Sequence, residues 1–587
     1  MEQWYVAAKK ADFGKIAEEF GIDPVLARII RNRDVEGSEN IRKFLYGGAE
    51  ELYAPELLKD SEKGAGILQR AITEKKKIRV IGDYDVDGIC AAHILCSGLR
   101  RAGALVDVVI PHRMKDGYGL NDHLILQARE DGCELLVTCD NGIAAIEQVV
   151  LAKKLQMQVV ITDHHEVLFE EEEGRKREIL PMADAVIDPK RSDCGYPFSG
   201  ICGAVVAMKV MQVLLRKTNP EEERVFLEEM IPFAAVATVC DVMELLDENR
   251  ILVREGLKHL RNSPCVGLGA LMHVNGLEPE RLNSHHLGFV LGPCINATGR
   301  LDTAKRALEL LACTEESRAV QIAQELKELN DSRKSMTAKG VEEAQSLIKQ
   351  QGLMQDKVLV IYLPDCHESL AGIIAGRLRE TYDRPVFVLT DSEEGVKGSG
   401  RSIAAYHMYE ELVKCRECLT KFGGHKMAAG LSLEKEKIPL LRDKLNAGCT
   451  LTEDDFIRKV HIDVPMPISY ANLPLAMQLE LLEPFGNGNP RPLFAQKDVL
   501  FLQGRRMGAR GNSARYTVLD DRNGKKELVY FGDLEVFHRF LEEKFGEDAI
   551  RLLYGTGGRY PVHIVYQLGV NRFRGKESPQ LIMQNFS

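Results

Sequence analysis

The sequence lacks the features that mark membrane and secreted proteins. None of its apolar stretches approaches the roughly 18 residues that a membrane-spanning helix needs. The N-terminal stretch MEQWYVAAKK has no basic segment followed by an apolar one, which is the pattern of a signal peptide. These absences predict a cytoplasmic protein with no membrane partner.

Paired cysteines and internal repeats are also scarce. The 14 cysteines are scattered singly, as is typical of reduced thiols, except for Cys415 and Cys418. This pair has no second pair nearby, so two thiols on one helical face are favoured over a zinc site. Without solenoid repeats or low-complexity tracts, 587 residues indicate about three to four globular domains.

Positive charge is low over most of the chain. The net charge of −10 argues against a protein coated in basic surface. Residues 456–587 are the exception, with 18 Lys and Arg against 14 Asp and Glu. A basic segment on an acidic body indicates a local contact with a polyanion.

Apolar strands alternate with helices from Lys77 onward. The strand-like runs are IRVIG, VDVVIP, ELLVTCD, QVVITDHH and DAVIDP, and helices are expected over 91–102, 146–155 and 203–215. This alternation predicts a parallel sheet that is covered on both faces. Ligands bind such sheets outside the carboxyl ends of the strands. The charged stretch 170–178 is expected to be a solvated loop.

The remaining segments complete the predicted α/β architecture. Helical spacing over 303–350 predicts a long connecting helix, KVLVIYLP and PVFVLT predict a second α/β domain, and short strands beyond Lys459 predict a small β-barrel. The expected domains are an N-terminal helical cap of the parallel-sheet domain (1–75), the parallel-sheet domain (76–310), the long helix (311–351), the second α/β domain (352–455) and the barrel (456–587).

Carboxylates and imidazoles follow the strands of the first sheet. The residues at these strand ends, with one on a later helix, are Asp83, Asp85, Asp87, Asp140, Asp163, His164, His165 and Asp241. In an extended segment, Asp85 and Asp87 face the same side. For any single aspartate, a helix N-cap is the alternative interpretation. The recurrence at several strand ends favours one shared site.

This set of side chains indicates divalent cations. Sites rich in oxygen with one imidazole suit Mn²⁺ or Mg²⁺ better than zinc. Two ions about 3.5–4 Å apart that share a carboxylate form the arrangement used on phosphate esters. The sequence therefore predicts two divalent cations and a phosphodiester substrate.

The same stretches resemble the DHH phosphoesterase superfamily and, more closely, its RecJ family. The matching stretches are GDYDVDG, VTCDNGI, ITDHHE, VIDPKR, INATGRLDTA, GSGRS, FGGHKMAAG and EPFGNGNPRPLF, and they extend over nearly the whole chain. The resemblance implies a DHH catalytic domain, a DHH-associated domain and a C-terminal OB-fold. It also implies 5′-to-3′ hydrolysis of single-stranded DNA to 5′-mononucleotides by a two-metal-ion mechanism, in DNA repair and recombination.

The resemblance assigns roles to the clustered side chains. The implied metal ligands are Asp85, Asp87, Asp140, His164 and Asp241. Asp140 would bridge the ions and act as a catalytic residue together with His165, which would contact the scissile phosphate. Many superfamily members have a histidine where this chain has Ile81. Our hypothesis is that Asp83 replaces this missing ligand.

The second domain and the barrel would hold the DNA. Glycines in GSGRS and FGGHKMAAG free backbone N–H groups for phosphate, although a glycine pair alone is often a tight turn. The implied DNA and phosphate contacts outside the barrel are Arg113, Asn296, Arg300, Ser399, Arg401, Ser402, Gly424 and His425. Those in the barrel are Arg505, Arg506, Arg510, Arg515 and Tyr516. OB-folds bind single strands through basic grooves and stacked aromatic rings, but any one ring can instead belong to the barrel core.

The implied partners are single-stranded DNA with a 5′ end, a single-strand-binding protein and a helicase, and the implied state is a monomer. Two alternative functions remain. One is a DHH phosphodiesterase that acts on short oligonucleotides or cyclic dinucleotides, against which the C-terminal segment 456–587 argues. The other is a catalytically inactive single-strand-binding scaffold, against which the presence of every acid argues.

Overall fold

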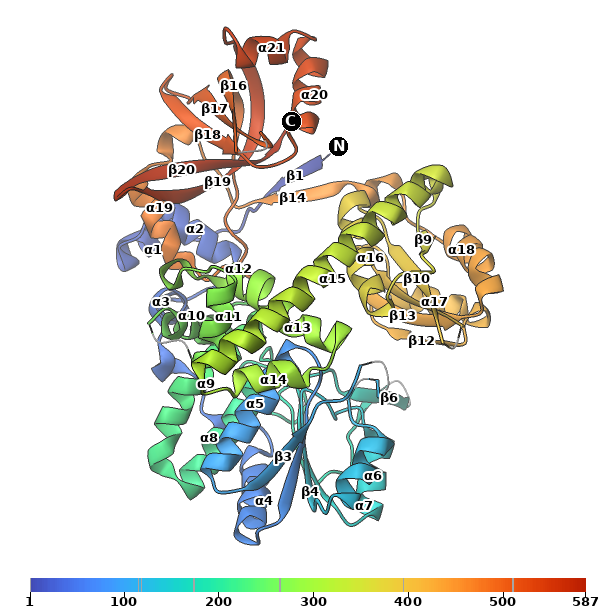
Figure 1. Ribbon diagram of the computed structural model, residues 1–587. Coiled ribbons are helices and arrows are strands. Elements are labelled where there is room, and N and C mark those ends of the chain that lie inside the picture. The colour runs from blue at the N-terminus through green and yellow to red at the C-terminus, as the bar shows by residue number, and fades with distance from the viewer. Residues whose placement is uncertain are drawn as a thin grey trace.

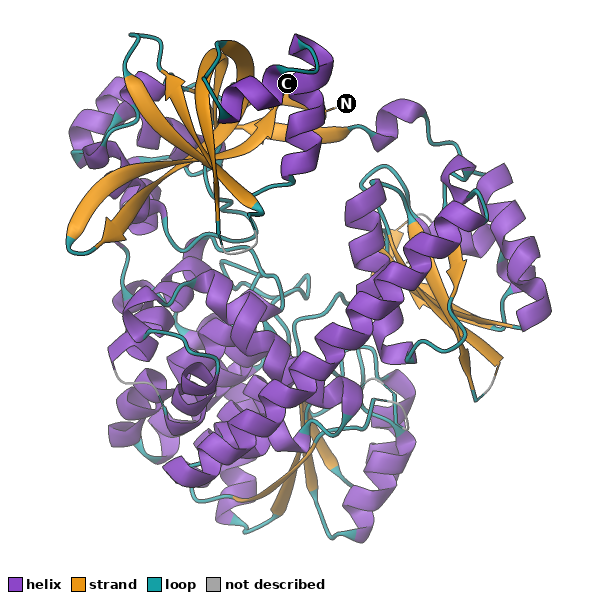
Figure 2. Ribbon diagram, turned by 45° about the horizontal axis from the view of Figure 1, so that its top comes forward, coloured by secondary structure: helices purple, strands orange, loops and turns teal. Residues whose placement is uncertain are grey.

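Three sheets, each with its own helices, form three bodies of the chain (Figures 1 and 2). The computed structural model describes residues 2–113, 116–117, 119–172, 175–262, 265–393, 395–508 and 511–587. The helix α15 (Glu316–Gln350) leads from the first body to the second, and β14 (Arg458–Ile462) leads from the second toward the third. Among the described residues, no helix is both long and apolar enough to cross a bilayer.

The first sheet has five parallel strands in the order β3-β2-β4-β5-β8. Their bounds are Lys77–Ile81 (β2), Leu105–Val109 (β3), Leu135–Cys139 (β4), Gln158–Thr162 (β5) and Ala185–Ile187 (β8). One face packs against α4 (Ser61–Thr73), α5 (Val86–Arg101) and α8 (Gly203–Thr218), and the other packs against α6 (Asp122–Glu130) and α7 (Ile146–Lys154). Because both faces are buried, the strands are continuous apolar runs. The predicted parallel sheet is confirmed.

A layer of helices lies between this sheet and α15. It comprises α9 (Pro220–Cys240), α10 (Asp247–Asn262), α11 (Val266–Val274), α12 (Ser284–His286), α13 (Gly292–Leu301) and α14 (Lys305–Leu311). The expected helix over 303–350 is therefore divided into α14 and α15. The first half of α15 buries Ile322 and Leu326 in the core of the first body, and its second half buries Ala344 and Ile348 in that of the second. One continuous helix thus joins the two bodies.

The second sheet is mixed, with the order β12-β13-β11-β10-β9. Its strands are Leu359–Tyr362 (β9), Val386–Ser392 (β10), Gly395–Arg401 (β11), Lys421–Gly424 (β12) and Ala428–Leu433 (β13). Only β9 and β10 are parallel to each other. The helices of this body are α16 (Glu368–Tyr382), α17 (Met408–Lys414) and α18 (Ile438–Ala447).

The C-terminal body is a closed barrel. Its strands are Val464–Pro465 (β15), Phe494–Met507 (β16), Ser513–Leu519 (β17), Lys525–Tyr530 (β18), Tyr560–Phe573 (β19) and Lys576–Phe586 (β20). The long strand β16 pairs with both β17 and β19, which closes a ring of five strands. The helices α19 (Leu473–Leu479), α20 (Leu534–Phe545) and α21 (Ala549–Tyr554) accompany it.

The N-terminal helices pack against the barrel body, not against the parallel sheet as predicted, and α3 also contacts α10 of the first body. Residues of α1 (Phe13–Phe20), α2 (Pro24–Asn32) and α3 (Ser38–Tyr46) belong to the hydrophobic cluster that contains the barrel core. The strand β1 (Glu2–Val6) also pairs in parallel with β14. The prediction of one cap over residues 1–75 is therefore wrong for this first part, because an amphipathic helix specifies an apolar face but not its partner.

The charged stretch 170–178 is also different from the prediction. Residues 170–172 and 175–178 belong to the paired strands β6 (Leu168–Glu172) and β7 (Arg175–Ile179), and residues 173–174 lie outside the described residues. The register places Glu170 opposite Arg177 and Glu171 opposite Lys176. Opposite charges that face each other across two strands stabilise such a pair.

Candidate active site

The acids and imidazoles of the first sheet converge at its carboxyl edge. Potential ligand atoms lie within 4.8 Å of one another in three groups: Asp83, Asp85 and Asp140; Asp87, His164 and Asp241; and Asp140, His164 and His165. The first two groups share no residue. They meet where His164 Nε2 lies 3.0 Å from Asp140 Oδ1. The edge therefore offers two adjacent cation positions, with Asp140 at their junction.

Backbone N–H groups hold the carboxylates of the DYDVD stretch. Asp85 is the N-cap of α5, and its Oδ1 accepts a hydrogen bond from Gly88 N at 3.0 Å. Asp87 accepts hydrogen bonds from Gly203 N at 2.6 Å and Ala204 N at 2.8 Å, at the N-terminus of α8. The positive end of a helix stabilises a carboxylate. These two aspartates therefore cap helices and also belong to the cluster, so the two interpretations are compatible.

Asp140 occupies a tight turn after β4. Its φ of +59° is left-handed, which aspartate tolerates better than most residues. A Cβ atom on Gly203 would lie only 2.8 Å from Asp140 Cβ, so glycine is required for this close approach. The turn thereby brings Asp140 next to the N-terminus of α8 and close to Asp87.

Asp163, the first residue of the DHH motif, orients the two histidines. Its Oδ1 accepts hydrogen bonds from His164 N and His165 Nδ1, both at 2.7 Å, and its Oδ2 accepts one from Ile143 N at 2.9 Å. Burial opposes ionisation of Asp163, but the hydrogen bond and charge of His165, with the hydrogen bond from Ile143 N and the charge of His164, together lower the carboxyl pKa. Burial lowers the pKa of His165, yet the contact with Asp163 raises it overall to about 9. This orienting role of Asp163 was not predicted from the sequence.

Negative charge accumulates in the cluster, and the nearby positive groups His165, Arg113 and Lys190 compensate it only in part. Burial and the neighbouring Asp85 raise the pKa of Asp83 to about 8, and burial with Asp87 and Asp85 raises that of Asp241 to about 8. Asp83 Oδ1 and His164 Nδ1 are buried without a hydrogen-bond partner among the described residues. Burial lowers the pKa of His164, which favours the neutral imidazole that binds metals. This donor set fits Mn²⁺ or Mg²⁺.

A cluster of three arginines, Arg113, Arg300 and Arg401, lies beside the acids. The guanidinium of Arg113 lies 4.9 Å from the Tyr84 ring centre. Burial, together with the neighbouring Arg113, Arg333 and Arg401, lowers the pKa of Arg300 to about 10. Among the described residues, none of the three arginines forms a salt bridge with a carboxylate. Arg300 instead donates to the Ser369 carbonyl at 2.7 Å. Guanidinium groups without carboxylate partners form a site for an anion.

A cavity of about 450 Å³ lies between the first body and the second sheet, with Arg113 in its lining. Its lining includes Tyr84 and Arg113 from the first body, and Lys397, Ser399 and Lys421 from the second. The cavity therefore brings Arg113 and Ser399 together, as the predicted DNA contacts require.

The other residues that were predicted to contact phosphate in this region do not line this cavity. Arg401 donates to Ser399 Oγ at 3.2 Å, and Asn296 is half-buried on α13. Gly424 and His425 are exposed where β12 turns toward β13. The prediction for Ser402 is wrong, because its buried hydroxyl donates to the Tyr406 carbonyl at 2.8 Å and not into the cavity.

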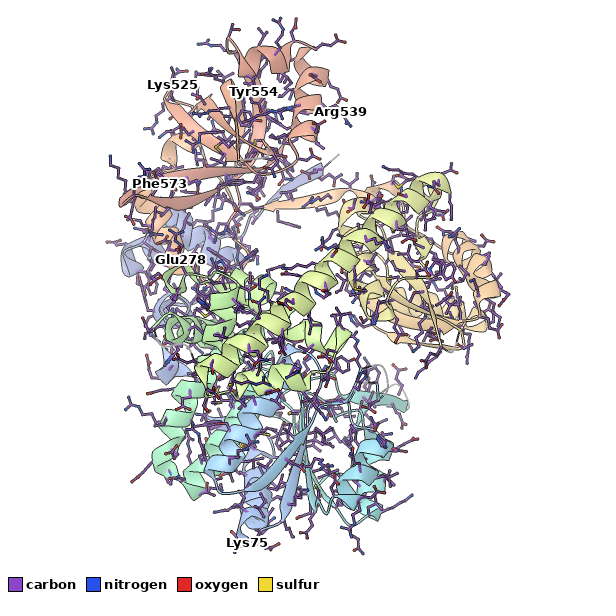
Figure 3. The ribbon with its side chains drawn as sticks, in the orientation of Figure 1. Lys75, Glu278, Lys525, Arg539, Tyr554 and Phe573 are labelled. Atoms are coloured by element: carbon purple, nitrogen blue, oxygen red, sulfur yellow. The ribbon has the colours of Figure 1, made fainter. Side chains whose placement is uncertain are left out.

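The barrel has a second, basic cavity of about 770 Å³. Arg505, Arg506 and Arg515 line it together with Tyr554, whose ring centre lies 5.9 Å from the Arg506 guanidinium. Figure 3 labels Tyr554 on the barrel body and Lys75 at the opposite end of the molecule. Arg510 lies outside the described residues.

Tyr516 belongs to the barrel core and not to this basic cavity. Its side chain is 0% exposed, its ring packs against Phe501 and Phe537, and its hydroxyl lies 3.0 Å from that of Tyr554. The prediction that Tyr516 contacts DNA is therefore wrong. The aromatic residue that reaches the cavity is Tyr554, which was not predicted because it lies on a helix outside the strand pattern.

Comparison with known domain families divides the chain in agreement with these bodies. Residues 77–238 match the DHH family N-terminal domain, residues 355–450 match the DHHA1 domain, and residues 462–585 match the RecJ OB domain. Each match falls on one of the three sheets.

Relatives and solved structures that are similar over nearly the whole chain agree with this division into domains. The single-stranded-DNA-specific exonuclease RecJ of Bacillus subtilis is 32% identical over 99% of this chain and 70% of its own length. That of Escherichia coli is 32% identical over 96% of each chain. The crystal structure of RecJ from Thermus thermophilus with Mn²⁺ has a TM-score of 0.80 and 26% identity, and covers 100% of this chain and 79% of that one. The crystal structure of the same protein with Mg²⁺ has a TM-score of 0.73 and 24% identity, and covers 100% of this chain and 78% of that one. On this full-length similarity, the chain belongs to the RecJ family of the DHH superfamily.

Proposed function

We propose that this chain is a metal-dependent exonuclease that hydrolyses single-stranded DNA from its 5′ end to 5′-mononucleotides. Its relatives are single-stranded-DNA-specific exonucleases. The observation that carries the proposal is the juxtaposition of two acidic ligand groups with three arginines that lack carboxylate partners among the described residues. A terminal phosphate bound at the arginines would bring the next phosphodiester toward the acids.

In this proposal, two Mn²⁺ or Mg²⁺ ions are held by Asp85, Asp87, Asp140, His164 and Asp241. Asp83 completes the first ligand group, where Ile81 is buried in β2 and offers no donor. Bound divalent cations supply Lewis acidity toward phosphate oxygens and lower the pKa of water. The chain contributes the fixed positions of these oxygens, which Asp163, Gly88 and the N-terminus of α8 determine.

His165 would bind the scissile phosphate as a cation. In the metal-free protein, the contact with Asp163 raises the pKa of His165 to about 9, which favours the protonated ring. Its Nδ1 lies 2.7 Å from Asp163 Oδ1, which fixes the orientation of the ring. Its side chain is 44% exposed, which leaves access for a phosphate. A preorganised positive donor stabilises the charge that develops on phosphoryl oxygens.

The arginine cluster would determine the polarity of digestion. Arg113, Arg300 and Arg401 can bind a terminal phosphate through paired N–H groups, and Ser399 can add a hydroxyl donor. Asn296, Gly424 and His425 lie on the elements that bear or face this site. A pocket for a terminal phosphate selects a strand end, and its place beside the acids selects release of one nucleotide at a time.

The barrel would hold the downstream strand. Arg505, Arg506 and Arg515 offer charge to the phosphate backbone, and Tyr554 offers a ring to a base. The proposed domains are the DHH domain (76–310), the long helix (311–351), the DHH-associated domain (352–455) and the OB-fold (456–587). The three N-terminal helices are now assigned to the barrel body. A cytoplasmic monomer acting in repair and recombination, with a helicase and a single-strand-binding protein, completes the proposal.

End-labelled oligonucleotides test this function. Single-stranded DNA labelled at the 5′ end should release labelled mononucleotide at once with Mn²⁺, whereas a 3′ label should stay on shortening strands. Asp140→Ala should abolish both signals. Release from the 3′ end first would contradict the polarity. DNA binding without cleavage by the wild-type protein would favour the scaffold, and preference for dinucleotides over long strands would favour the short-oligonucleotide phosphodiesterase.

A further inference from the structure

The turn that carries Asp241 is strained. Asp241 ends α9, and the next residue, Val242, has a φ of +57°. A left-handed conformation is unfavourable for a β-branched residue and persists only where surrounding structure imposes it. The Val242 side chain is 66% exposed, so its own packing does not impose this conformation. Within the turn, Met243 N donates to the Thr238 carbonyl at 3.1 Å, and a second part of the chain also holds it.

That part is the loop 483–490, which leads into the barrel. Asn487 Nδ2 donates to the Val242 carbonyl at 2.8 Å, and Leu245 N donates to the Asn487 carbonyl at 2.8 Å. The two hydrogen bonds enclose the residues that follow Asp241. A Cβ atom on Gly488 would lie 3.0 Å from Glu244 Cβ, so glycine permits this close approach of the two loops.

The loop is itself rigidly held. Asn489, which is 0% exposed, donates from Nδ2 to the carbonyls of Leu482 at 2.8 Å and Pro484 at 2.9 Å. The buried guanidinium of Arg250 on α10 donates to the carbonyls of Leu481 and Leu482 at 2.9 and 2.8 Å. Asn487 is therefore presented from a fixed support and not from a free loop.

We propose that Asn487 is a positioning residue for Asp241, and that the C-terminal segment thereby controls the cation position formed by Asp87, His164 and Asp241. Asp241 Oδ2 lies 3.6 Å from His164 Nε2, so a rotation of the strained turn would separate two members of this group. This inference rests on the proposed metal role of Asp241. It couples the loop before the DNA-holding barrel directly to the metal centre.

Mn²⁺ binding to the full-length protein tests the inference without any measurement of activity. Free Mn²⁺ would be followed by electron paramagnetic resonance during titration of the wild type and Asn487→Ala. The substitution removes the hydrogen bond to the Val242 carbonyl and the one that Asn487 Oδ1 accepts from Gly488 N at 3.0 Å, and it leaves that between Leu245 N and the Asn487 carbonyl. We expect one of two Mn²⁺ affinities to fall by about 10-fold, as for other residues that orient metal ligands, and the other to stay unchanged.

Three further variants separate the possible causes. Asn472→Ala is the matched control, because Asn472 caps α19 through Leu475 N in the same part of the chain and should leave both affinities unchanged. Asp241→Ala should abolish binding of the ion whose affinity Asn487→Ala lowers. Val242→Gly in the Asn487→Ala background should restore affinity, because glycine adopts a positive φ without strain.

Each outcome has one meaning. If Asp241→Ala leaves Mn²⁺ binding intact, the proposed metal role of Asp241 fails, and the inference fails with it. If Asp241→Ala weakens binding but Asn487→Ala does not, only the positioning role is overturned. Equal losses in Asn487→Ala and Asn472→Ala, or no rescue by Val242→Gly, would also overturn it.

Discussion

The acidic centre and the basic cavity of the barrel hold their charges in opposite ways. Asp83, Asp87 and Asp140 are almost fully buried, and they come from different turns that backbone contacts hold in place. Arg505 and Arg506 are exposed neighbours on a single strand. Phosphodiester hydrolysis requires ligand oxygens at fixed positions, whereas the affinity for a single strand depends mainly on the number of positive charges near its phosphates. The two regions should therefore respond very differently to substitution.

The largest effect is expected at the junction of the acidic groups. Asp140→Ala should lower kcat by more than about 1,000-fold, because the charge stabilisation by metal ions is worth several kcal/mol and each ~1.4 kcal/mol is a factor of ten. Single-turnover cleavage of a labelled strand measures it. Asp331→Ala on the exposed side of α15 is the matched control and should keep wild-type activity. A loss below tenfold would show that this buried geometry is not essential.

A smaller effect is expected in the arginine cluster. Arg401→Ala should lower kcat/KM by roughly 10- to 100-fold on a 5′-phosphorylated strand, since a hydrogen bond to a charged group contributes ~1.5–3 kcal/mol. Arg401→Lys should recover only part of the lost kcat/KM, because lysine lacks the paired N–H donors of arginine. Comparison with a 5′-hydroxyl strand checks the role. Equal losses on both strands would contradict terminal-phosphate binding.

The barrel should tolerate change more readily. Arg505→Ala with Arg506→Ala should weaken single-strand binding several-fold at low salt and lower the slope of log affinity against log salt by about 1.4, or ~0.7 for each phosphate that is no longer neutralised. Fluorescence anisotropy across a salt series measures both. At saturating DNA, kcat should stay unchanged. A fall in kcat comparable to that of Asp140→Ala would remove the contrast between the two regions.

The smallest effect concerns the pH dependence of stability in metal-free protein. Asp83 and Asp241 have a pKa of about 8 in the fold against 3.8 ordinarily, so the folded chain holds protons that the unfolded chain has lost. His165, at about 9 against 6.5, stabilises the fold below pH 6.5 and ceases to do so as pH rises through 9. The contribution of the two aspartates falls as pH rises from 3.8 to about 8, and that of His165 falls from pH 6.5 to about 9, so stability decreases across the range from 6.5 to 9.

The thermal midpoint in EDTA should therefore decrease over this range, and Mn²⁺ should reduce the decrease by compensating the carboxylates. Scanning calorimetry at several pH values measures it. Asp83→Asn combined with Asp241→Asn should flatten the profile in EDTA. A midpoint that rises from pH 6.5 to 9 in metal-free protein would contradict the crowding of carboxylates in the centre.

Local pattern was sufficient to predict the first sheet and its acids. Continuous apolar runs between helices specify a parallel sheet, and the carboxyl ends of such strands share one edge, so Asp85, Asp140 and His164 had to meet there. Even the alternative of helix capping was consistent with this, because Asp85 and Asp87 cap helices from within the cluster.

Tertiary structure alone decided which faces meet. The N-terminal helices carry an apolar stripe that suits any partner, and only the fold places it against the barrel body. Alternation along a strand does not say whether Tyr516 points to the core or to the groove, nor whether the Ser402 hydroxyl faces a phosphate or the Tyr406 carbonyl. The contact of Asn487 with the turn of Asp241 joins residues far apart in sequence. Periodicity and strand ends are local properties that sequence records, whereas such contacts depend on how separate bodies pack.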